Sequence, residues 1–477
     1  MLTLEYANCL ADRVGVHGLD PDLFEPGAEL DAACRHLTDR LSQSRGKGWE
    51  RWRELPFGSF RDGHVRGVHE IVERVRGRFD NLVVLGIGGS ALGNTALQMA
   101  LNPSTYNLLD AVERSGPRLF VVDNVDPSLL SAVLNICERQ GGLERTLFNV
   151  ISKSGETAET AAQFMVVRDR LKQRFGARHA EHVIAITDPA KGTMRTICDA
   201  EGYATLPVPD GVGGRFSVLS PVGLFSAAMC GIDIDALLDG AASMDMACRE
   251  HELSKNPAAM LAALLVELAA RKGKPNHVLM PYSNALYGLA DWYRQLWAES
   301  LGKQRDVRGE EVFAGFTPIK ALGATDQHSQ IQLYREGPND KVIGLIEVAT
   351  FGDDEVTIPR GLGVEAIAYL EGATMGGLLN AERRATEFAL VESQRPNYTI
   401  RFPRIDAHHV GEFIQLWQVA TAYAGLMLNV DAYDQPAVEL GKQATFGLMG
   451  RAGYERIKAR IDETTGTAGR VIGPSRG

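Results

Sequence analysis

The feature that most constrains the fold is an alternation of short apolar runs with helical stretches, which begins near Asn81. Four runs are apolar almost throughout: NLVVLGI, RLFVVDN, LFNVIS and HVIAIT. Between them lie segments with helical spacing, such as AETAAQFMVVRDRL. Strands that are apolar on both faces belong to parallel sheets covered by helices on both sides. The sequence therefore predicts an α/β fold, with a first doubly wound domain over residues 61–247.

The second half of the chain has the same character. Further strands are expected at HVLMPY, PIKALGA, KVIGLIEV, ATEFALVES and YTIRFPR, and a long helix at EFIQLWQVATAYAGLMLN. These elements predict a second doubly wound α/β domain over residues 248–445. Residues 1–60 are expected to form a helical segment, because ELDAACRHLTDRLSQ has apolar residues at helical spacing. Residues 446–477 are expected to form a helix and a Gly/Thr-rich, mobile tail.

Composition and charge narrow the class of protein. The 477 residues include 50 Lys and Arg against 60 Asp and Glu, which gives a net charge of −10. An acidic surface repels phosphate backbones and anionic lipids, which argues against nucleic acid and membrane partners. Six separated cysteines form no C-x-x-C pair, and the amino terminus lacks the basic charge of a signal peptide. We therefore expect a reducing, cytoplasmic location.

The first candidate site is a glycine-rich turn between a strand and a helix. Gly86, Gly88 and Gly89 lie in VVLGIGGSALGNTAL, where exposed backbone amides can approach an anion. The spacing imitates a dinucleotide-binding fingerprint, but the acidic residue expected at the end of the second strand is not well placed. A tight turn without a ligand is the alternative.

The second candidate site is rich in hydroxyl groups. Its members lie at the end of a strand and in the first turn of the next helix: Ser152, Ser154, Thr157 and Thr160. Hydroxyls and exposed amides at a helix amino terminus form a compact phosphate site. Because no Walker sequence is present, a single phosphate on a small molecule fits better than a nucleoside triphosphate. Helix capping alone is the alternative, although four hydroxyls exceed what one cap needs.

Two further segments carry charged candidates. Arg215 follows a glycine pair in DGVGGRFSVLSPVG, where an arginine can hold an anion or the negative charge that develops on an oxygen. Asp291, Gln295 and Glu299 recur every four residues on one flank of a helix, and Glu299 lies near its carboxyl end, which suits a general base. A surface ion pair and a solvated acidic face are the respective alternatives.

Three polar residues in the last third complete the set. His328 lies in ATDQHSQIQLY, and Gln435 and Lys442 lie in NVDAYDQPAVELGK. A metal site at His408 and His409 is not favoured, because adjacent histidines cannot easily ligate one ion.

Taken together, these segments resemble the glucose-6-phosphate isomerase (phosphoglucose isomerase) family, in a compact bacterial form. The resemblance runs from Asn81 to Lys442, and six motifs carry it in order: GIGGS, SKSGETAET, GGRFS, Q-x-x-x-ESLGK, DQHS and QPAVELGK. It implies two sugar-isomerase domains, and the isomerisation of glucose 6-phosphate and fructose 6-phosphate in glycolysis and gluconeogenesis. Ala437 stands where family members commonly have Gly, and Leu301 where many have Asn, but neither replaces a reacting group.

The resemblance also implies a role for each candidate. The substrate phosphate would be held by residues of two loops: Gly89, Ser90, Ser152, Lys153, Ser154 and Thr157. His328 and Lys442 would open the sugar ring, and Glu299 would move a proton between carbons 2 and 1 through a cis-enediol intermediate. Arg215 would stabilise the negative charge on that intermediate. The sugar would be oriented by two glutamines: Gln295 and Gln435.

Members of the family are homodimers, and the resemblance implies that His328 acts across the interface. It implies no cofactor and no metal. Three other interpretations stay open at this point. The first is a related isomerase that also accepts mannose 6-phosphate. The second is a sugar-phosphate sensor, which would not need Glu299, His328 and Lys442 together. The third is a nicotinamide dehydrogenase, an interpretation that rests only on the glycine spacing.

Overall fold

In the computed structural model, residues 1–465 are described. They divide into two compact units, Met1–Ala432 and a second unit that begins at Tyr433, and each is described by itself. The predicted tail lies largely outside the described residues, at 466–477. In the described part of the chain, none of the helices combines the length and the apolar character that crossing a membrane requires.

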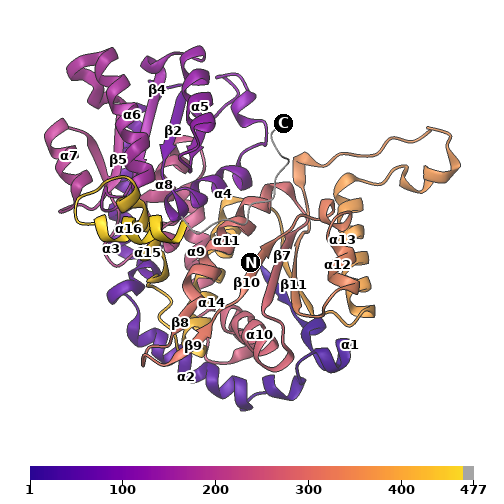
Figure 1. Ribbon diagram of the computed structural model, residues 1–477. Helices are drawn as coiled ribbons and strands as arrows, with labels where there is room; N and C mark the ends of the chain where they lie inside the picture. Colours follow the sequence, from indigo (N-terminus) through magenta and orange to yellow (C-terminus); the bar gives the residue numbers. More distant parts are fainter. Residues whose placement is uncertain (466–477) are drawn as a thin grey trace, which may run out of the picture. The chain divides into compact units, whose positions relative to one another are not determined.

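The first sheet contains five parallel strands in the order β3-β2-β4-β5-β6 (Figure 1). Their bounds are Arg118–Val122, Asn81–Leu85, Thr146–Ile151, Val183–Thr187 and Ala204–Pro207. Every residue of β2, β4 and β5 is buried, as expected for strands covered on both faces. The intervening helices are α4 (Leu92–Leu101), α5 (Pro127–Arg139), α6 (Ala158–Phe175) and α7 (Thr193–Glu201).

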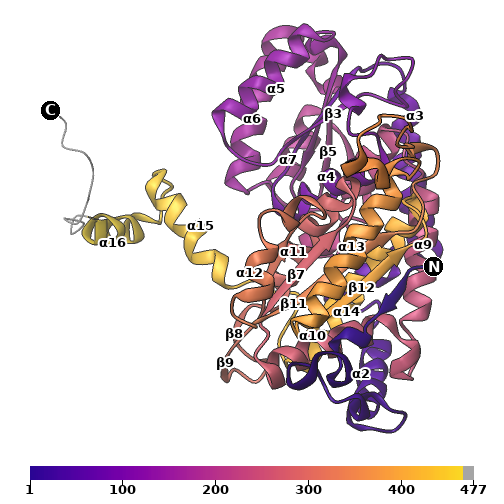
Figure 2. The ribbon, with the colours of Figure 1, turned by 90° about the vertical axis from the view of Figure 1, so that its right-hand side faces the viewer.

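The second sheet has the order β1-β12-β11-β7-β10 (Figure 2). Four parallel strands form most of it: β7 (Asn276–Pro281), β10 (Thr317–Lys320), β11 (Lys341–Val348) and β12 (Asn397–Phe402). The edge strand β1 (Thr3–Glu5) pairs antiparallel with β12. The predicted α/β class, with two mainly parallel sheets and helices, is confirmed.

Read from β10, the second sheet repeats the strand order of the first. In the first sheet, β3 lies on one side of β2, and β4 and β5 lie on the other side. In the second sheet, β10 lies on one side of β7, and β11 and β12 lie on the other side. The order in which strands are added to each sheet therefore changes direction at β2 and at β7. In open α/β sheets, ligands bind outside the carboxyl ends of the strands at such a switch point.

The amino-terminal segment and one predicted strand differ from expectation. Helix α2 (Glu29–Ser44) follows the predicted pattern, but Thr3–Glu5 forms a strand rather than a helix because it completes the edge of the second sheet. The predicted strand ATEFALVES is wrong, since it is the last part of helix α13 (Met375–Glu392). Buried positions Arg383, Thr386 and Leu390 recur at helical spacing, and the Thr374 side chain caps the helix by accepting from the Gly377 amide.

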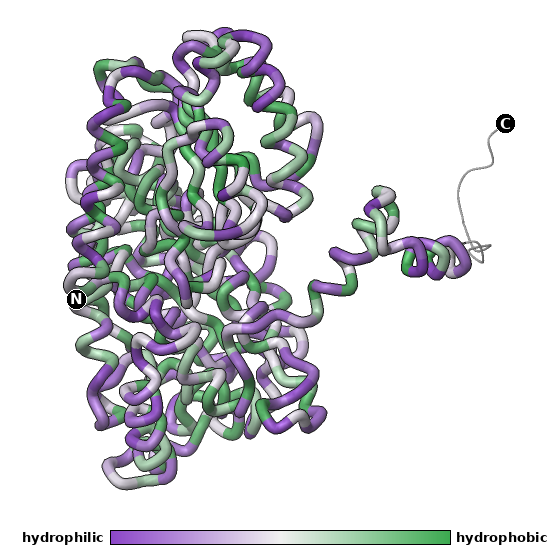
Figure 3. The backbone as a smooth tube through the Cα atoms, turned by 90° about the vertical axis from the view of Figure 1, so that its left-hand side faces the viewer, coloured by the Kyte–Doolittle hydropathy of each residue, from purple (hydrophilic) through white to green (hydrophobic). Residues whose placement is uncertain are grey.

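Long helices fill the space between the two sheets. In α14 (Ala407–Met427), residues 410–425 are all buried, and it packs against α9 (Ile234–Ala247), α10 (Pro257–Lys272) and α11 (Tyr287–Leu301). A helix that is apolar on all sides belongs in a core. In Figure 3 the helices of residues 1–432 change between hydrophilic and hydrophobic colour every few residues, as amphipathic helices do.

The remaining elements of residues 1–432 connect these layers. Helix α3 (Gly58–Val75) precedes β2, and α8 (Pro221–Met229) follows the first sheet. A two-stranded sheet, β8 (Lys303–Arg305) and β9 (Glu311–Ala314), follows α11. Short helix α1 (Ala11–Val14) follows β1, and short helix α12 (Ile331–Glu336) lies between β10 and β11. A long loop between β11 and α13 projects from the second sheet (Figure 1).

The second unit contains two helices, α15 (Ala437–Leu448) and α16 (Glu455–Thr465). They are joined by a turn in which the rings of Phe446 and Tyr454 lie 5.3 Å apart, and the guanidinium of Arg451 lies 4.5 Å from the Phe446 ring centre. The predicted domain boundaries stay predictions.

Candidate active site

The glycine loop after β2 is shaped by close packing against the Arg215 turn. A Cβ atom added at Gly89 would lie 2.2 Å from the carbonyl carbon of Gly214 and 2.7 Å from the Arg215 nitrogen. Gly88 has a positive φ of 57° and leaves room for Gln295, whose Nε2 would be 2.9 Å from an added Cβ. Asn94 then donates to the Ser90 carbonyl as α4 begins. The glycines are therefore needed where two other segments approach the loop.

The hydroxyl-rich loop after β4 forms a compact turn. The Gly155 amide donates to Ser152 Oγ at 3.0 Å, and the Glu156 amide donates to Ser154 Oγ at 3.1 Å. Gly155 has a φ of 78°, and an added Cβ would lie 2.3 Å from the Met194 nitrogen, so only glycine fits there. Thr157 stands at the amino-terminal cap position of α6, but its side chain makes no capping hydrogen bond. Capping alone therefore does not account for this hydroxyl.

These two loops lie at one edge of the first sheet. Strands β2 and β4 are neighbours and parallel, with Leu85 paired to Val150, so the loops that follow them leave the sheet side by side. This is the switch point of the sheet, where ligands of open α/β folds bind. The sequence-predicted phosphate residues share this edge: Gly89, Ser90, Ser152, Lys153, Ser154 and Thr157.

Arg215 is the buried charge of the site. Its residue is 4% exposed, and each end of its guanidinium is held. Nε donates to Ser300 Oγ at 2.7 Å, Nη2 donates to the Ala432 carbonyl at 2.7 Å, and Nη1 lies 3.1 Å from Glu299 Oε1. Because a buried guanidinium stays charged and its contacts fix the plane of the group, this positive charge has one orientation.

Glu299 is held from two sides near the end of α11. Arg215 contacts Oε1, and Gln295, one turn earlier on the same flank, donates through Nε2 to Oε2 at 3.0 Å. The side chain of Glu299 keeps 28% of its surface exposed, so a small molecule can reach the carboxylate. Asp291, the third member of the predicted flank, instead pairs with Lys320 and Arg294, and the hydrogen bonds from these two side chains lower its pKa although burial acts to raise it.

The structure therefore brings three predicted groups together and joins them to the glycine loop. Gln295 and Glu299 come from the helix that follows the first strand of the second sheet, whereas Gly88 and Gly89 follow the first strand of the first sheet. Arg215 lies between them. A carboxylate next to a fixed cation, beside amides that can bind an anion, is suited to proton transfer with charge developing on oxygen.

Among residues 1–432, His328 is not part of this arrangement. His328 follows the turn after β10 with its side chain exposed, and among residues 1–465 its ring makes no hydrogen bond or ion pair. Lys442 and Gln435 belong to the unit that begins at Tyr433. Within that unit, Lys442 Nζ lies 2.7 Å from Glu439 Oε1, one turn earlier on α15, and both side chains are exposed.

The sequence did not predict two features of the site, the buried Ser300 and two tryptophans of the amino-terminal segment. Ser300 is fully buried and accepts the hydrogen bond from Arg215, and its position directly after Glu299 was the available signal. The amino-terminal segment also reaches the site, since Trp52 stacks on Phe216 at 5.0 Å and Lys153 Nζ lies 5.0 Å from the Trp49 ring centre. No local pattern marks those tryptophans, because their partners are far away in the sequence.

One carboxylate lies under the hydroxyl-rich loop. The Asp188 amide donates to the Lys153 carbonyl, and hydrogen bonds from the Ala190 and Lys191 amides lower the pKa of the Asp188 carboxyl. Asp188 therefore stays ionised, and its carboxylate stabilises the turn after β5, next to the loop that carries Lys153.

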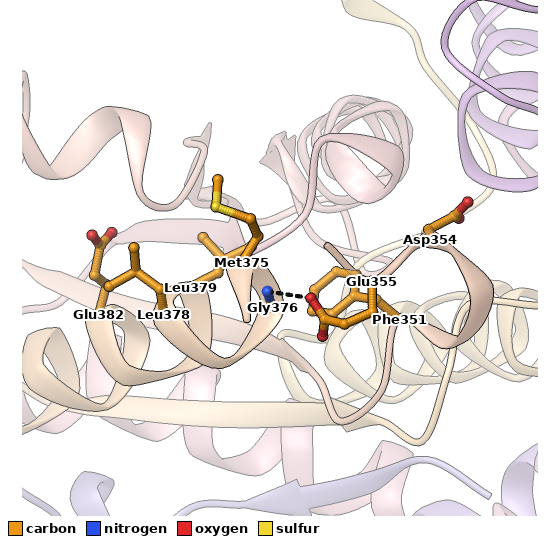
Figure 4. A pocket seen from close by; sticks show the side chains of 8 residues that line it. All are labelled: Phe351, Asp354, Glu355, Met375, Gly376, Leu378, Leu379 and Glu382. Atoms are coloured by element: carbon orange, nitrogen blue, oxygen red, sulfur yellow. Dashed lines mark hydrogen bonds between the residues drawn. The ribbon is translucent and has the colours of Figure 1, made fainter. Parts of the chain in front are cut away.

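A second hollow lies near the carboxyl end of β11 and has different chemistry (Figure 4). It has a volume of about 290 Å³, and its lining combines apolar side chains with three carboxylates: Phe351, Met375, Leu378, Leu379, Asp354, Glu355 and Glu382, together with Gly376. Glu355 Oε1 accepts from the Gly376 amide at 2.8 Å. Such an acidic hollow repels a phosphate, so the first sheet offers the better anion site.

Within residues 1–465, no group of three or more His, Cys, Asp or Glu side chains could hold a metal ion. His409 Nδ1 lies 2.8 Å from Asp406, and His408 Nε2 lies 3.4 Å from Glu412, so each histidine faces its own carboxylate.

Comparison with known proteins shows which family the chain resembles. A family model described as phosphoglucose isomerase matches residues 67–467. The chain is 44% identical over 437 residues to a glucose-6-phosphate isomerase from Carboxydothermus hydrogenoformans, which covers 91% of this chain and 93% of that protein. It is 46% identical over 463 residues to the one from Rubrobacter xylanophilus, with coverage of 95% and 99%.

Solved structures give the same result for the fold. A hypothetical protein from Thermus thermophilus has a TM-score of 0.81 at 35% identity, covering 94% of this chain and 100% of that one. A glucose-6-phosphate isomerase from Chlamydia trachomatis has a TM-score of 0.80 at 23% identity, covering 97% and 92%. Because the family model spans most of the chain and close relatives cover nearly all of it, the chain belongs to the phosphoglucose isomerase family.

Proposed function

We propose that this aldose–ketose isomerase interconverts glucose 6-phosphate and fructose 6-phosphate at the carboxyl edge of its first sheet, with Glu299 as the proton carrier. The observation that carries the proposal is the position of Glu299, fixed between Arg215 and Gln295 beside the glycine loop. Membership of the phosphoglucose isomerase family and the names of its relatives support the reaction and its place in glycolysis and gluconeogenesis.

The proposed reaction moves two protons and changes no net oxidation state. Once the ring is open, Glu299 takes the proton from carbon 2 of the aldose, the electron pair of that bond forms the carbon 1–carbon 2 double bond, and the aldehyde oxygen takes up the carbonyl electron pair and a proton to give a cis-enediol. Glu299 then returns its proton to carbon 1, while the hydroxyl on carbon 2 loses its proton and becomes the ketone. Arg215 stabilises the negative charge on oxygen during the transfer, because its own charge cannot be lost to the intermediate.

The phosphate is proposed to bind between the two loops of the first sheet. The Gly89 amide, the Ser90 hydroxyl and the hydroxyls of the second loop supply donors, and Lys153 adds positive charge. The hydroxyls are those of Ser152, Ser154 and Thr157. The support for this binding mode is that β2 and β4 are adjacent parallel strands, so both loops face one ligand-sized region.

Ring opening is proposed for His328 and Lys442, and Gln435 would help Gln295 to orient the sugar. His328 is exposed and makes no side-chain bond within the described chain, which leaves its ring available to a neighbouring subunit. We therefore propose a homodimer in which His328 serves the partner's site.

Mixing His328→Ala and Glu299→Gln proteins tests the shared site. Each parent dimer is inactive, but a hybrid dimer has one site with both groups intact, so part of the activity returns. Subunit exchange is verified with differently tagged chains. Exchange without any recovery would place His328 in its own subunit's site or outside catalysis.

A cytoplasmic location is proposed as well. All six cysteines are buried and unpaired, which fits a reducing compartment.

The decisive experiment measures conversion of fructose 6-phosphate, coupled to glucose-6-phosphate dehydrogenase. Glu299→Gln keeps the shape of the side chain and removes the base, so kcat is expected to fall by about 100-fold or more with KM largely kept. Glu336→Gln, an exposed glutamate on α12, is the matched control and should retain full activity. Near-normal turnover of Glu299→Gln would mean that another group is the base.

A further inference from the structure

A polar hollow of about 300 Å³ lies at the opposite edge of the first sheet. Its floor is formed by residues just before three adjacent strands: Asp80 before β2, Pro117 before β3 and Arg145 before β4. The ends of two helices complete the wall, through Val75 of α3 and Met229 of α8. The isomerase site lies beyond the carboxyl ends of the same strands, so the whole sheet separates the two.

The central feature of this hollow is Arg114. It is 7% exposed, and its guanidinium donates only to carbonyl groups, from Nη1 to Leu109 at 2.7 Å and from Nε to Gly116 at 3.3 Å. Among residues 1–465, no carboxylate lies within ion-pair distance of it, the limit being 4.0 Å. Burial, together with the charge of Arg118, lowers the pKa of the Arg114 guanidinium, although Tyr106, Asp80 and Asp110 act to raise it. A buried cation without an anion in contact is costly, which points to a further negative partner.

The other two arginines of the lining are paired with carboxylates. Arg145 makes a two-pronged pair with Asp80, at 3.0 Å from Nε to Oδ2 and 2.7 Å from Nη2 to Oδ1. Asp80 is the single carboxylate of the lining, against three arginines: Arg76, Arg114 and Arg145. Arg76 pairs with Glu73, which is exposed outside the hollow, and the carboxyl ends of α3 and α8 each contribute roughly half a negative charge. Among residues 1–465, Arg114 is therefore the arginine of the lining that has no carboxylate in contact.

The hollow is also open to solvent. Arg76, Gly77, Ala111 and Ser115 are exposed at its mouth, whereas Arg114 lies inside. Its volume of about 300 Å³ is at the lower end of small-molecule sites. A compact ligand with concentrated negative charge fits these dimensions and the guanidinium groups of the lining.

We propose that this hollow, lined by Arg76, Arg114 and Arg145, is a second anion site that binds a small polyphosphate or polycarboxylate metabolite. The anion pairs with Arg114 and draws on Arg76, whose present partner, Glu73, lies outside the hollow and is exposed. Charge-assisted and two-pronged contacts from guanidinium groups favour phosphate and carboxylate oxygens. Because strands of five residues extend about 17 Å, an anion here does not touch the isomerase site.

Pyrophosphate is the probe, titrated by calorimetry into the full-length protein. Four proteins are compared: the native chain, Arg114→Gln, Ala111→Glu and Ala111→Gln. Ala111→Glu adds a carboxylate at an exposed position of the lining, three residues before Arg114. The new carboxylate should form an ion pair with the Arg114 guanidinium and so compete with a bound anion. Ala111→Gln has the same size without the charge and is its matched control.

We expect the native protein and Ala111→Gln to bind one more equivalent of pyrophosphate than the other two. In Arg114→Gln and Ala111→Glu, affinity at this site should fall about 10-fold or more, the scale of one charge-assisted contact. Competitive inhibition of fructose 6-phosphate turnover by pyrophosphate reports the isomerase site separately and should be equal in all four. Equal stoichiometry and affinity in all four proteins would overturn the proposal, whatever the isomerase assay gives. If Arg114→Gln does not fold, the pair at position 111 decides alone.

Discussion

After the third parallel strand of each sheet, the chain makes a turn in which a side-chain hydroxyl accepts a hydrogen bond from a glycine amide. Following β4, Ser152 Oγ accepts from the Gly155 amide at 3.0 Å, and following β11, Thr350 Oγ1 accepts from the Gly352 amide at 3.2 Å. Both glycines have a positive φ, 78° and 57°. Strand order, turn chemistry and backbone conformation therefore correspond in the two sheets.

The residues next to these turns differ in charge. The first turn carries Lys153, Glu156 and hydroxyl-bearing residues, so its two charges balance, whereas the second carries three acids, Asp353, Asp354 and Glu355. Figure 4 shows two of those acids in the lining of the acidic hollow. The comparison teaches that the sheet topology provides a crevice twice, and that the charge of the loops decides which crevice takes a phosphate.

The largest contrast is expected between Gly89→Ala and Gly376→Ala. The added methyl group at Gly89 would lie 2.2 Å from the Gly214 backbone and must displace the Arg215 turn, whereas at Gly376 it would meet the Phe351 side chain at 2.4 Å. We expect kcat/KM for fructose 6-phosphate to fall about 100-fold or more in Gly89→Ala, because a 1 Å misplacement has effects on that scale. Gly376→Ala should stay within about 2-fold of the native value, because the acidic hollow takes no part in catalysis.

Circular dichroism must show that both glycine variants fold. A comparable loss of kcat/KM in Gly376→Ala would mean that the hollow of the second sheet also serves the reaction, and the contrast between the sheets would fail.

A second contrast compares the two hydroxyls. Ser152→Ala removes a buried hydroxyl from the proposed phosphate loop, so KM is expected to rise about 10-fold, the scale of one hydrogen bond to a charged group. Thr350→Ala removes the matching hydroxyl from the acidic turn and should leave KM unchanged. Steady-state kinetics in both directions provide the measurement, and equal KM values for the two variants would contradict the assignment of the phosphate to the first sheet.

A third effect concerns α11, which follows β7 of the second sheet but contributes Glu299 to the site at the edge of the first sheet. Ser300→Ala removes the acceptor of the Arg215 Nε hydrogen bond. The guanidinium keeps its charge but loses part of its fixed orientation, so kcat should fall about 5- to 10-fold with KM within about 2-fold. Ser226→Ala, at another buried serine, should change stability and leave kcat unchanged. A change in KM alone would show that Ser300 acts on binding instead.

The smallest effects are expected from residues just before the amino ends of β2 and β7. The stability of the protein should depend on Asp80 at acidic pH and on Lys274 at alkaline pH. Before β2, the hydrogen bond from Arg145 lowers the pKa of Asp80, so its contribution to stability is present above its ordinary range and is lost as pH falls through the folded value. Before β7, burial lowers the pKa of Lys274 from 10.5 to about 8. Because the folded state then holds fewer protons than the unfolded state, stability rises between about pH 8 and 10.5.

Urea unfolding across pH checks both directions. Lys274→Met should remove a rise of about 1–3 kcal/mol in unfolding free energy above pH 8, relative to the native chain. Asp80→Asn should flatten the curve only in acid. Parallel curves for the native chain and Lys274→Met above pH 8 would show that the lysine is not perturbed by its surroundings.

Much of the first sheet could be predicted from local sequence. Each apolar run that was assigned to it became a strand, because residues buried on both faces leave a continuous signal. The second sheet was harder. The run ATEFALVES contains the β-forming residues Thr, Phe and Val, yet it is helical. Arg383 pairs with Glu347 and Glu387, and Leu390 is buried on the same face of the helix two turns later.

The amino-acid sequence alone determined which groups are available: the glycine and hydroxyl loops, a carboxylate at the end of a helix and an arginine on an open turn. It also determined the fold class, because hydrophobic periodicity is a local property. The tertiary structure decided that Ser300 orients Arg215, that Gln295 reaches Gly88, that β1 completes the second sheet and that Arg114 has no acidic partner among residues 1–465. These contacts join residues far apart in the chain, and the packing of whole elements fixes them, so no local pattern can reveal them.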